Sequence, residues 1–215
     1  MDYLVIYFLL VLTFILAAVS VLQFYKGRRI NLKILEHSIR AMEKIFDPKD
    51  KNYTIIGIYV GYTAFYKIYR KTLSTIHATV LLLPRQSLLY MPIARLTSRH
   101  DKVYLIFNYN REMIVEAHVV KKGYYRLGVK RAIKNIEKMK VEKTKINGKD
   151  YYLIYTQKSM AQKLVDYISS LKNPHMINHV AVVPKLKRLY VAARLDKENL
   201  NDFLRKTYEL AMSLA

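Results

Sequence analysis

An uncharged run of 23 residues near the N-terminus limits what this chain can fold into. It extends from Tyr3 to Tyr25, and as a single helix it would span about 34 Å, enough to cross a hydrocarbon core of ~30 Å. Tyr3, Tyr7 and Tyr25 lie near its ends, where aromatic side chains meet the membrane interface. The sequence therefore predicts a transmembrane anchor over residues 1–25.

The charges beside this run predict its orientation. Lys26, Arg28 and Arg29 follow it at once, whereas only Asp2 carries charge before it. Basic residues favour the cytoplasmic side, so we expect a single-pass protein of the cell membrane with its N-terminus outside and residues 26–215 in the cytoplasm. A cleaved signal peptide would need basic charge ahead of a shorter apolar run, and a pilin-like subunit would carry its basic processing site there too.

The part that follows the anchor is strongly basic. All 37 Lys and Arg residues follow residue 25, together with 15 of the 16 acidic residues. This part of the chain therefore has a net charge of +22. A positive field of this size favours anionic lipid headgroups, nucleic acid or ribosomes as partners. The chain has no cysteine, which excludes disulfides and thiolate ligands.

The remaining pattern predicts an α+β domain. Residues 26–52 are expected to form a basic juxtamembrane segment and a helix that ends before Pro48, and residues 53–215 one basic cytoplasmic domain. Runs rich in β-branched and aromatic residues predict strands, with hairpins near residues 108–111 and at Asn147-Gly148. Residues 151–214 read as β-α-β-β-α. We expect a mostly antiparallel sheet with helices on one side.

No catalytic, cofactor or metal site is predicted. The sequence contains no phosphate-binding loop, nucleophile elbow or metalloprotease motif, and no Ser, His and acid set stands out. His175 and His179 flank a strand-like run, where a step of four residues is too long for one metal ion. His77 and His118 are expected to be ordinary sheet histidines. We therefore expect a binding protein and not an enzyme.

Two groups of residues are candidates for phosphate binding. The bases that follow the anchor form the first group, and a segment with eleven Lys and Arg between Lys121 and Lys149 forms the second. Tyr124 and Tyr125 lie among these bases, as in surfaces that stack nucleic-acid bases or contact lipid headgroups; a solvated basic face with core tyrosines is the alternative. The candidate anion-binding residues are Lys26, Arg28, Arg29, Lys121, Lys122, Arg126, Lys130, Arg131, Lys134 and Lys138.

The stretch LLLPRQSLLYMPIARLTSRHD, residues 81–101, is a candidate contact loop. Two prolines interrupt its apolar residues, and three arginines border them. It could pack over the sheet edge as a buried loop, or form an apolar surface rimmed by arginine that lies on an anionic leaflet or a membrane partner. If the segment is extended, Leu88 and Leu89 face opposite ways. The candidate contact residues are Arg85, Leu88, Leu89, Met91, Arg95 and Arg99.

Three stretches carry a resemblance: DPKDKNYTIIGIYVGYTAFYKI, LLLPRQSLLYMP and SRHDKVYLIF. With them the chain resembles a group of archaeal proteins of unassigned function that have one N-terminal membrane helix. The resemblance covers most of the chain. It implies the anchored topology and no activity.

Two function classes follow. The first is a membrane-anchored binding or scaffold module that contacts anionic lipid headgroups or a membrane protein. The alternative is a membrane-tethered protein that binds nucleic acid or the ribosome.

Overall fold

The computed structural model describes residues 3–68, 70, 72–125, 133 and 136–214. Its first element is α1, Tyr3–Phe46, a single helix of 44 residues that passes through Gly27 without a break. It ends just before Pro48, because a proline has no backbone N–H to continue the helix and restricts the residue before it. An uncharged window of α1 near its N-terminus is long and apolar enough to cross a membrane, and none of that window is buried.

Among the described residues, nine strands and several shorter helices follow. The strands are β1 Asp50–Gly57, β2 Gly61–Lys67, β3 Leu73–Leu81, β4 Lys102–Tyr109, β5 Ala117–Lys121, β6 Lys140–Ile146, β7 Lys149–Tyr155, β8 Ile177–Val183 and β9 Arg188–Arg194. The helices are α2 Tyr90–Thr97, α3 Lys122–Tyr124, α5 Lys158–Ser170 and α6 Leu200–Ser213, with short 3-10 turns η2 Ile136–Lys138, η3 Pro174–Met176 and η4 Pro184–Leu186.

The described strands form one antiparallel sheet in the order β1-β2-β3-β4-β9-β8-β5-β7-β6. This confirms the predicted α+β class. The hairpin at Asn147-Gly148 forms as predicted, because both turn residues adopt the positive φ that Asn and Gly tolerate best. The hairpin predicted at residues 108–111 was wrong. β4 pairs with β3 and β9, whereas β5 pairs with β7 and β8.

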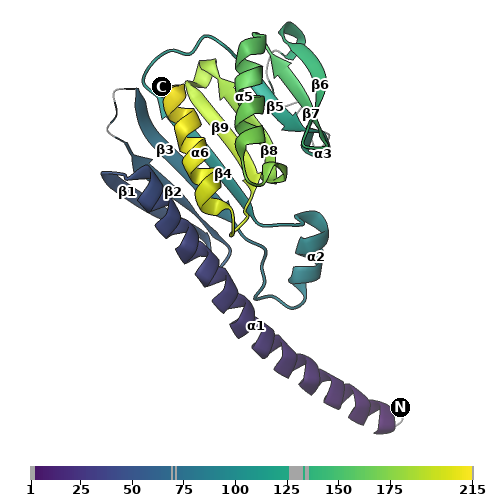
Figure 1. Ribbon diagram of the computed structural model, residues 1–215. Helices are drawn as coiled ribbons and strands as arrows, with labels where there is room; N and C mark the ends of the chain where they lie inside the picture. Colours follow the sequence, from purple (N-terminus) through teal and green to yellow (C-terminus); the bar gives the residue numbers. More distant parts are fainter. Residues whose placement is uncertain (1–2, 69, 71, 126–132, 134–135, 215) are drawn as a thin grey trace.

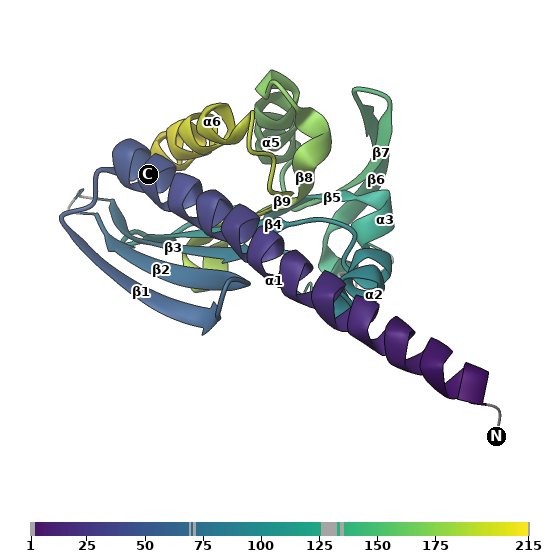
Figure 2. The same ribbon diagram turned by 90° about the horizontal axis from the view of Figure 1, so that it is seen from below.

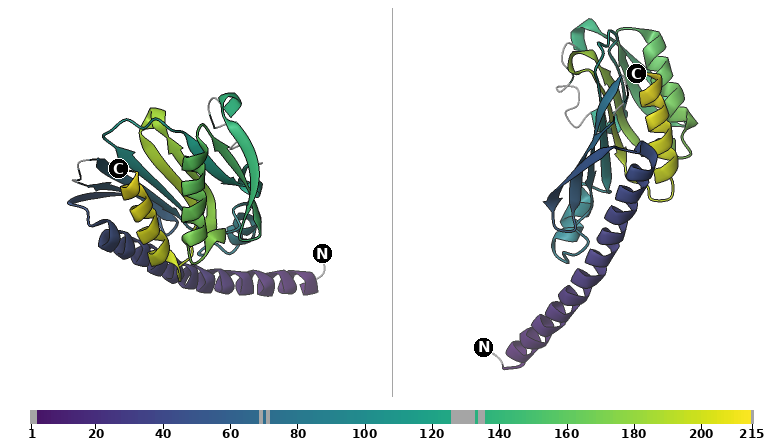
Figure 3. Two further views of the ribbon diagram at one scale, coloured as in Figure 1. Left: turned by 45° about the horizontal axis from the view of Figure 1, so that its top comes forward. Right: turned by 90° about the vertical axis from the view of Figure 1, so that its left-hand side faces the viewer.

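Helices cover one face of the sheet, and the other face is open over β2, β3 and β4 (Figures 1 and 3). The C-terminal half of α1 lies against the covered face, together with α6 and α5. Alternate residues of β3 and β4 enter this core, such as Val103, Leu105 and Phe107 of β4. A second, smaller hydrophobic cluster lies on the opposite face near β5 and β7. Its buried members are Val120, Ile133, Met139 and Ile154, and Tyr124, Tyr125, Ile136 and Tyr152 pack against them.

The C-terminal half of α1 belongs to the domain. Ile34, Met42 and Phe46 are almost fully buried in the main core. The predicted separation of residues 26–52 from the domain therefore needs correction, because their helix supplies part of the core and β1 begins at Asp50. The uncharged half of α1 is in consequence continuous with the helical part that packs in the domain, with no linker between them (Figure 2).

Candidate membrane-contact surface

The loop after β3 touches α1 where the uncharged run ends. Gly27 is buried, and a Cβ built on it would lie 2.1 Å from the carbonyl oxygen of Arg85. Only a residue without a side chain allows the helix and the loop to approach so closely. One turn earlier, the side-chain amide of Gln23 donates a hydrogen bond of 2.7 Å to the same carbonyl. Helix and loop are therefore fixed to each other at this level.

A buried asparagine extends this contact to a second loop. Asn31 is fully buried, and its Nδ2 donates to the carbonyl oxygens of Tyr59 at 2.7 Å and Leu83 at 2.9 Å. Tyr59 lies in the turn between β1 and β2, so one side chain of α1 holds both loops. A buried amide whose hydrogen bonds are satisfied specifies one geometry, since any other leaves it unpaired at a cost of about 1–3 kcal/mol.

Arg85 completes this junction. Its guanidinium donates to both carboxylate oxygens of Asp101, at 2.9 and 2.7 Å, and to Oδ1 of Asn31 at 3.0 Å. The side chain of Asp101 is 8% exposed and also accepts the backbone N–H of Leu83. Arg85 was expected on an exposed rim, and this expectation needs correction. It is a largely buried residue that joins the loop to α1 and to the start of β4.

The loop then turns into a short amphipathic helix with its apolar stripe in solvent. Leu89, Ile93 and Leu96 follow one another at helical spacing and are 81%, 56% and 79% exposed. Ala94, on the inner side, is buried. Pro92 is tolerated because it lies in the first turn of α2, where backbone N–H groups lack helical partners. A stripe of large apolar residues facing solvent indicates a surface that something else covers.

The end of β1 and the turn that follows it expose a second apolar group beside α1. Ile55, Ile56 and Ile58 are all largely exposed there. Tyr59 anchors this turn, because its ring packs edge-on to Phe24 and lies under the guanidinium of Arg28. β1 is also an edge strand, and an exposed apolar edge strand is prone to aggregate unless it is covered.

The two groups lie at the same end of the domain. Figures 1 and 3 show α2 and the β1–β2 turn at the end from which the N-terminal half of α1 projects. Gln23 and Asn31 contact both loops at the level where the uncharged run stops. We call the exposed members of these groups the apolar end surface. It consists of Ile55, Ile56, Ile58, Leu89, Tyr90, Ile93 and Leu96.

The predicted contact residues divide between this surface and the interior. Leu89, Arg95 and Arg99 are exposed, whereas Leu88 and Met91 are partly buried. The two neighbouring leucines thus differ in exposure, as predicted. The predicted reason was wrong, because residues 88–89 form a turn that leads into α2 and not an extended segment.

The predicted anion-binding residues that the structure describes do not form one cluster. Lys26 and Arg29 are exposed on α1, and Arg28 is half-buried against Tyr59. Lys121 donates to the carbonyl of His175, and Lys122 pairs with Asp150 at 2.9 Å. Lys138 is exposed at η2. The remaining predicted residues lie outside the part of the chain that the structure describes: Arg126, Lys130, Arg131 and Lys134.

A buried histidine pair lies on the face of the sheet opposite to α5 and α6. His118 Nδ1 and His179 Nε2 are 3.2 Å apart, and Nε2 of His118 is 3.2 Å from a carboxylate oxygen of Glu116. Burial lowers the pKa of both histidines, so both are neutral at pH 7. Among the described residues, no group of three or more His, Asp or Glu side chains could hold a metal ion.

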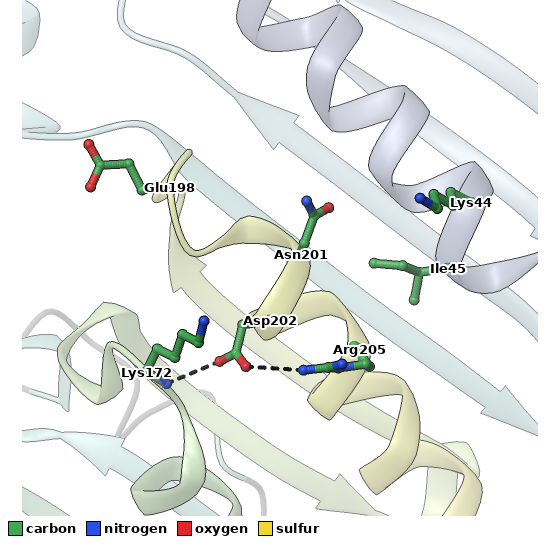
Figure 4. A pocket seen from close by; sticks show the side chains of 7 residues that line it. All are labelled: Lys44, Ile45, Lys172, Glu198, Asn201, Asp202 and Arg205. Carbon is green, nitrogen blue, oxygen red and sulfur yellow. Dashed lines mark hydrogen bonds and ion pairs between the residues drawn. The ribbon is translucent and has the colours of Figure 1, made fainter.

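A pocket of about 430 Å³ lies between the end of α1 and the start of α6, and Figure 4 shows its lining. Its central acid is Asp202, which accepts the backbone N–H of Lys172 at 3.0 Å and pairs with Arg205 at 3.6 Å and with Lys206. Three bases and two acids line this pocket, and the buried acid Asp202 is already paired with neighbouring bases, so no acid in the pocket interior is left for a cationic ligand. It is a weaker candidate than the apolar end surface.

Sequence reasoning missed several members of the surface. Ile55 and Ile56 were expected in a strand and do lie in β1, but their exposure was not predicted, and Gln23 and Asn31 drew no attention. One signal was present. Gln23 and Asn31 lie four residues on either side of Gly27, so all three share one face of a helix in which a glycine permits close packing.

Comparisons with known proteins add little. No family model matches the sequence, and no curated protein matches it. Among solved structures, the crystal structure of the mycobacterial trehalose monomycolate transport factor A is similar over 80% of this chain and 92% of that chain, with 10% identity and a TM-score of 0.42. That likeness is too distant to assign a function, and the resemblance to an archaeal group stays a prediction.

Proposed function

We propose that this protein is a single-pass membrane protein whose basic cytoplasmic domain binds the anionic inner leaflet. The observation that carries the proposal is the position of the apolar end surface. Its two groups of exposed apolar residues flank α1 at the level where the uncharged run ends and the first bases begin. A domain held in this way has its apolar end at the membrane interface as soon as α1 is inserted.

The rigidity of α1 supports this geometry. A flexible linker would let the domain tumble, so that contacts with lipid would depend on chance encounters. Here α1 is one helix, and Gln23, Gly27 and Asn31 fix it to both loops. Even weak contacts between α2 and lipid are then populated, because the anchor raises their effective concentration.

The charge distribution supports an anionic leaflet as the partner. Lys26, Arg29, Arg95 and Arg99 are exposed bases on α1 or near the exposed stripe of α2. Each basic residue close to an anionic surface contributes about 1 kcal/mol to binding. An amphipathic helix with apolar residues on one side and arginines beside them is typical of a helix that lies in the interface. The net charge of +22 after residue 25 acts in the same direction.

The chain offers a direct test, because it has no cysteine and single-cysteine labels can be placed freely. The full chain would be reconstituted in vesicles that contain phosphatidylglycerol, with a polarity-sensitive dye on Ile93→Cys. A dye on Leu186→Cys, exposed in η4 at the far end of the sheet, serves as the control. We expect a blue-shifted emission and quenching by lipid-borne quenchers at position 93 alone. Equal exposure of the two dyes to water would contradict the proposal.

A membrane protein partner is the other outcome of this test. If the dye on Ile93→Cys is shielded in native membranes but not in pure lipid vesicles, a protein covers the surface. Crosslinking from the same position would then identify that protein.

One observation favours the alternative of nucleic-acid or ribosome binding. The open face of the sheet carries the partly exposed rings of Phe65, His77, Tyr104 and Tyr190, and Arg188 and Arg194 are exposed on β9 beside them. Rings among bases can stack nucleotides. Purification in mild detergent with nucleic-acid quantification tests this. A site that contacts four phosphates should give a slope of log K against log salt of roughly −3.

A further inference from the structure

A cleft of about 440 Å³ lies between α2 and the adjoining ends of β3 and β4. Its walls are apolar over most of their length and include Val60, Leu82, Leu83, Tyr90 and Ala94. This volume falls within the range of about 300–1,000 Å³ that small-molecule sites occupy. The cleft and the apolar end surface share α2. Its outer stripe faces solvent, while Ala94 faces the cleft.

One end of the cleft is basic. His100 and Lys102 line it, and the register of β4 and β9 places Arg194 directly opposite Lys102. In the described part of the chain, neither Lys102 nor Arg194 forms an ion pair with a carboxylate. The adjacent acid, Asp101, does not form an ion pair with either base, because Arg85 donates hydrogen bonds to both of its carboxylate oxygens.

The titration of neighbouring groups reports the same excess of positive charge. Burial lowers the pKa of His100, and the charges of Arg194, Lys102 and Lys121 lower it further. Burial also lowers the pKa of Lys121, and the positive charges of Arg194 and Lys149 lower it further. Cations that repel one another in this way, without a compensating acid, are stabilised when an anion binds among them.

We propose that this cleft holds one anionic lipid molecule, with a hydrocarbon chain against Leu82, Leu83 and Ala94 and its phosphate between Lys102 and Arg194. The proposal rests on the proposed function, since it requires the domain to lie at the leaflet. A lipid fits better than a soluble anion because the basic end continues into an apolar wall that a small anion would leave empty. A lipid also needs no path through water, because the cleft opens beside the helix that contacts the leaflet.

The experiment uses the full chain, reconstituted in vesicles of equal parts phosphatidylglycerol and phosphatidylcholine and then extracted in mild detergent. Native mass spectrometry and lipid analysis would count the molecules that each chain retains. We expect one phosphatidylglycerol per chain. Ala94→Phe, which fills the cleft, and the double variant Lys102→Gln with Arg194→Gln should each reduce retention at least tenfold. Lys185→Gln, at the opposite end of the sheet, is the matched control.

Three results would overturn the proposal. They are the absence of retained lipid, equal retention of phosphatidylcholine, and displacement of the lipid by millimolar inorganic phosphate, which would indicate a site for a soluble anion. Melting curves identify any loss that is due to unfolding, and the double variant tests the site even if Ala94→Phe fails to fold. The dye on Ile93→Cys, measured in the chain with the cleft unchanged, separates the two proposals. A blue shift without bound lipid rejects the cleft alone, whereas the absence of both rejects the proposed function as well.

Discussion

Arg85 and Asp101 form a bidentate ion pair in which each nitrogen of the guanidinium end faces one carboxylate oxygen, at 2.9 and 2.7 Å. The pair is mostly enclosed, with the side chain of Arg85 20% exposed and that of Asp101 8% exposed. Arg85 also donates to Asn31 on α1. One side chain therefore couples α1, the loop before α2 and the start of β4.

We expect Arg85→Gln to lower the free energy of unfolding by about 3–5 kcal/mol, because it leaves the carboxylate of Asp101 buried without its partner. Thermal and denaturant unfolding of the full chain in detergent would measure this. Removing both partners should cost less than the sum of the single changes. Arg40→Gln is the control, since Arg40 and Glu36 pair in solvent and such pairs contribute about 0–1 kcal/mol. Equal effects of the two variants would show that the buried pair is not structural.

The role of Arg85 shows where the sequence ceased to be informative. Arg85, Arg95 and Arg99 all border the same apolar residues, and no feature of the neighbouring sequence distinguishes one arginine from another. Only the folded chain brings Asp101, 16 residues away, against one of them. The same limit explains the wrong hairpin between β4 and β5, because partners distant in sequence decide strand pairing. Local features were predicted correctly, such as the helix over the uncharged run and the turn at Asn147-Gly148.

The candidate site was only partly predictable for a similar reason. Exposure of Leu89 follows from the short helix that carries it, and that helix was not predicted because Pro92 was interpreted as a break. The isoleucines at the end of β1 and in the turn after it have the composition of a buried strand. Their exposure depends on their place at the sheet edge, which composition does not encode.

Gly27→Ala tests the close approach of α1 to the loop. Helix propensity alone would make this change stabilising by up to about 1 kcal/mol. We expect the opposite, a clear loss of stability, because the added Cβ would lie 2.1 Å from the carbonyl oxygen of Arg85 and would push the loop away. Gly123→Ala in α3 is the matched control, since no atom lies within 4 Å of its Cβ position. A melting temperature unchanged or raised by Gly27→Ala would show that the loop yields without cost.

The buried histidines should make the stability depend on pH. Burial lowers the pKa of His179 to about 3 in the folded protein, whereas an unfolded histidine titrates near 6.5. Between these values the unfolded chain binds a proton that the folded chain does not. The stability is therefore complete above pH 6.5 and falls as the pH falls, by about 1.4 kcal/mol per pH unit for one such group.

Denaturant unfolding between pH 4.5 and 7 would measure this slope. Carboxylates also contribute to it, so the informative quantity is the difference between the parent and His179→Phe. We expect the variant to be less stable at pH 7, because His118 loses a hydrogen-bond partner, but to lose less stability on acidification. Parallel curves for the two proteins would mean that His179 becomes protonated in the folded state at little cost.

The orientation of the anchor has its own test. With Lys26, Arg28 and Arg29 on one side and Asp2 on the other, we expect the domain inside the cell. Trypsin added to intact cells should leave residues 26–215 whole, although they contain every Lys and Arg of the chain. The same treatment after permeabilisation is the control and should digest exposed sites. Cleavage of the domain in intact cells would reverse the orientation and remove the inner leaflet as its partner.

Arg99 offers a test in which stability and membrane contact change in opposite directions. It follows the C-cap of α2 with φ near +60°, a left-handed conformation that glycine adopts more easily than arginine. We expect Arg99→Gly to stabilise the isolated fold by roughly 1 kcal/mol, because it removes the conflict between Cβ and the backbone. If Arg99 contacts the leaflet, the same change removes about 1 kcal/mol of attraction to anionic lipid. Unfolding in detergent and the blue shift of the dye on Ile93→Cys would measure the two effects separately.

Arg99→Lys retains both the charge and the strained backbone, so it should leave both quantities nearly unchanged. A more stable glycine variant with an undiminished blue shift would show that Arg99 does not contact the membrane, and would leave the apolar stripe of α2 to account for that contact.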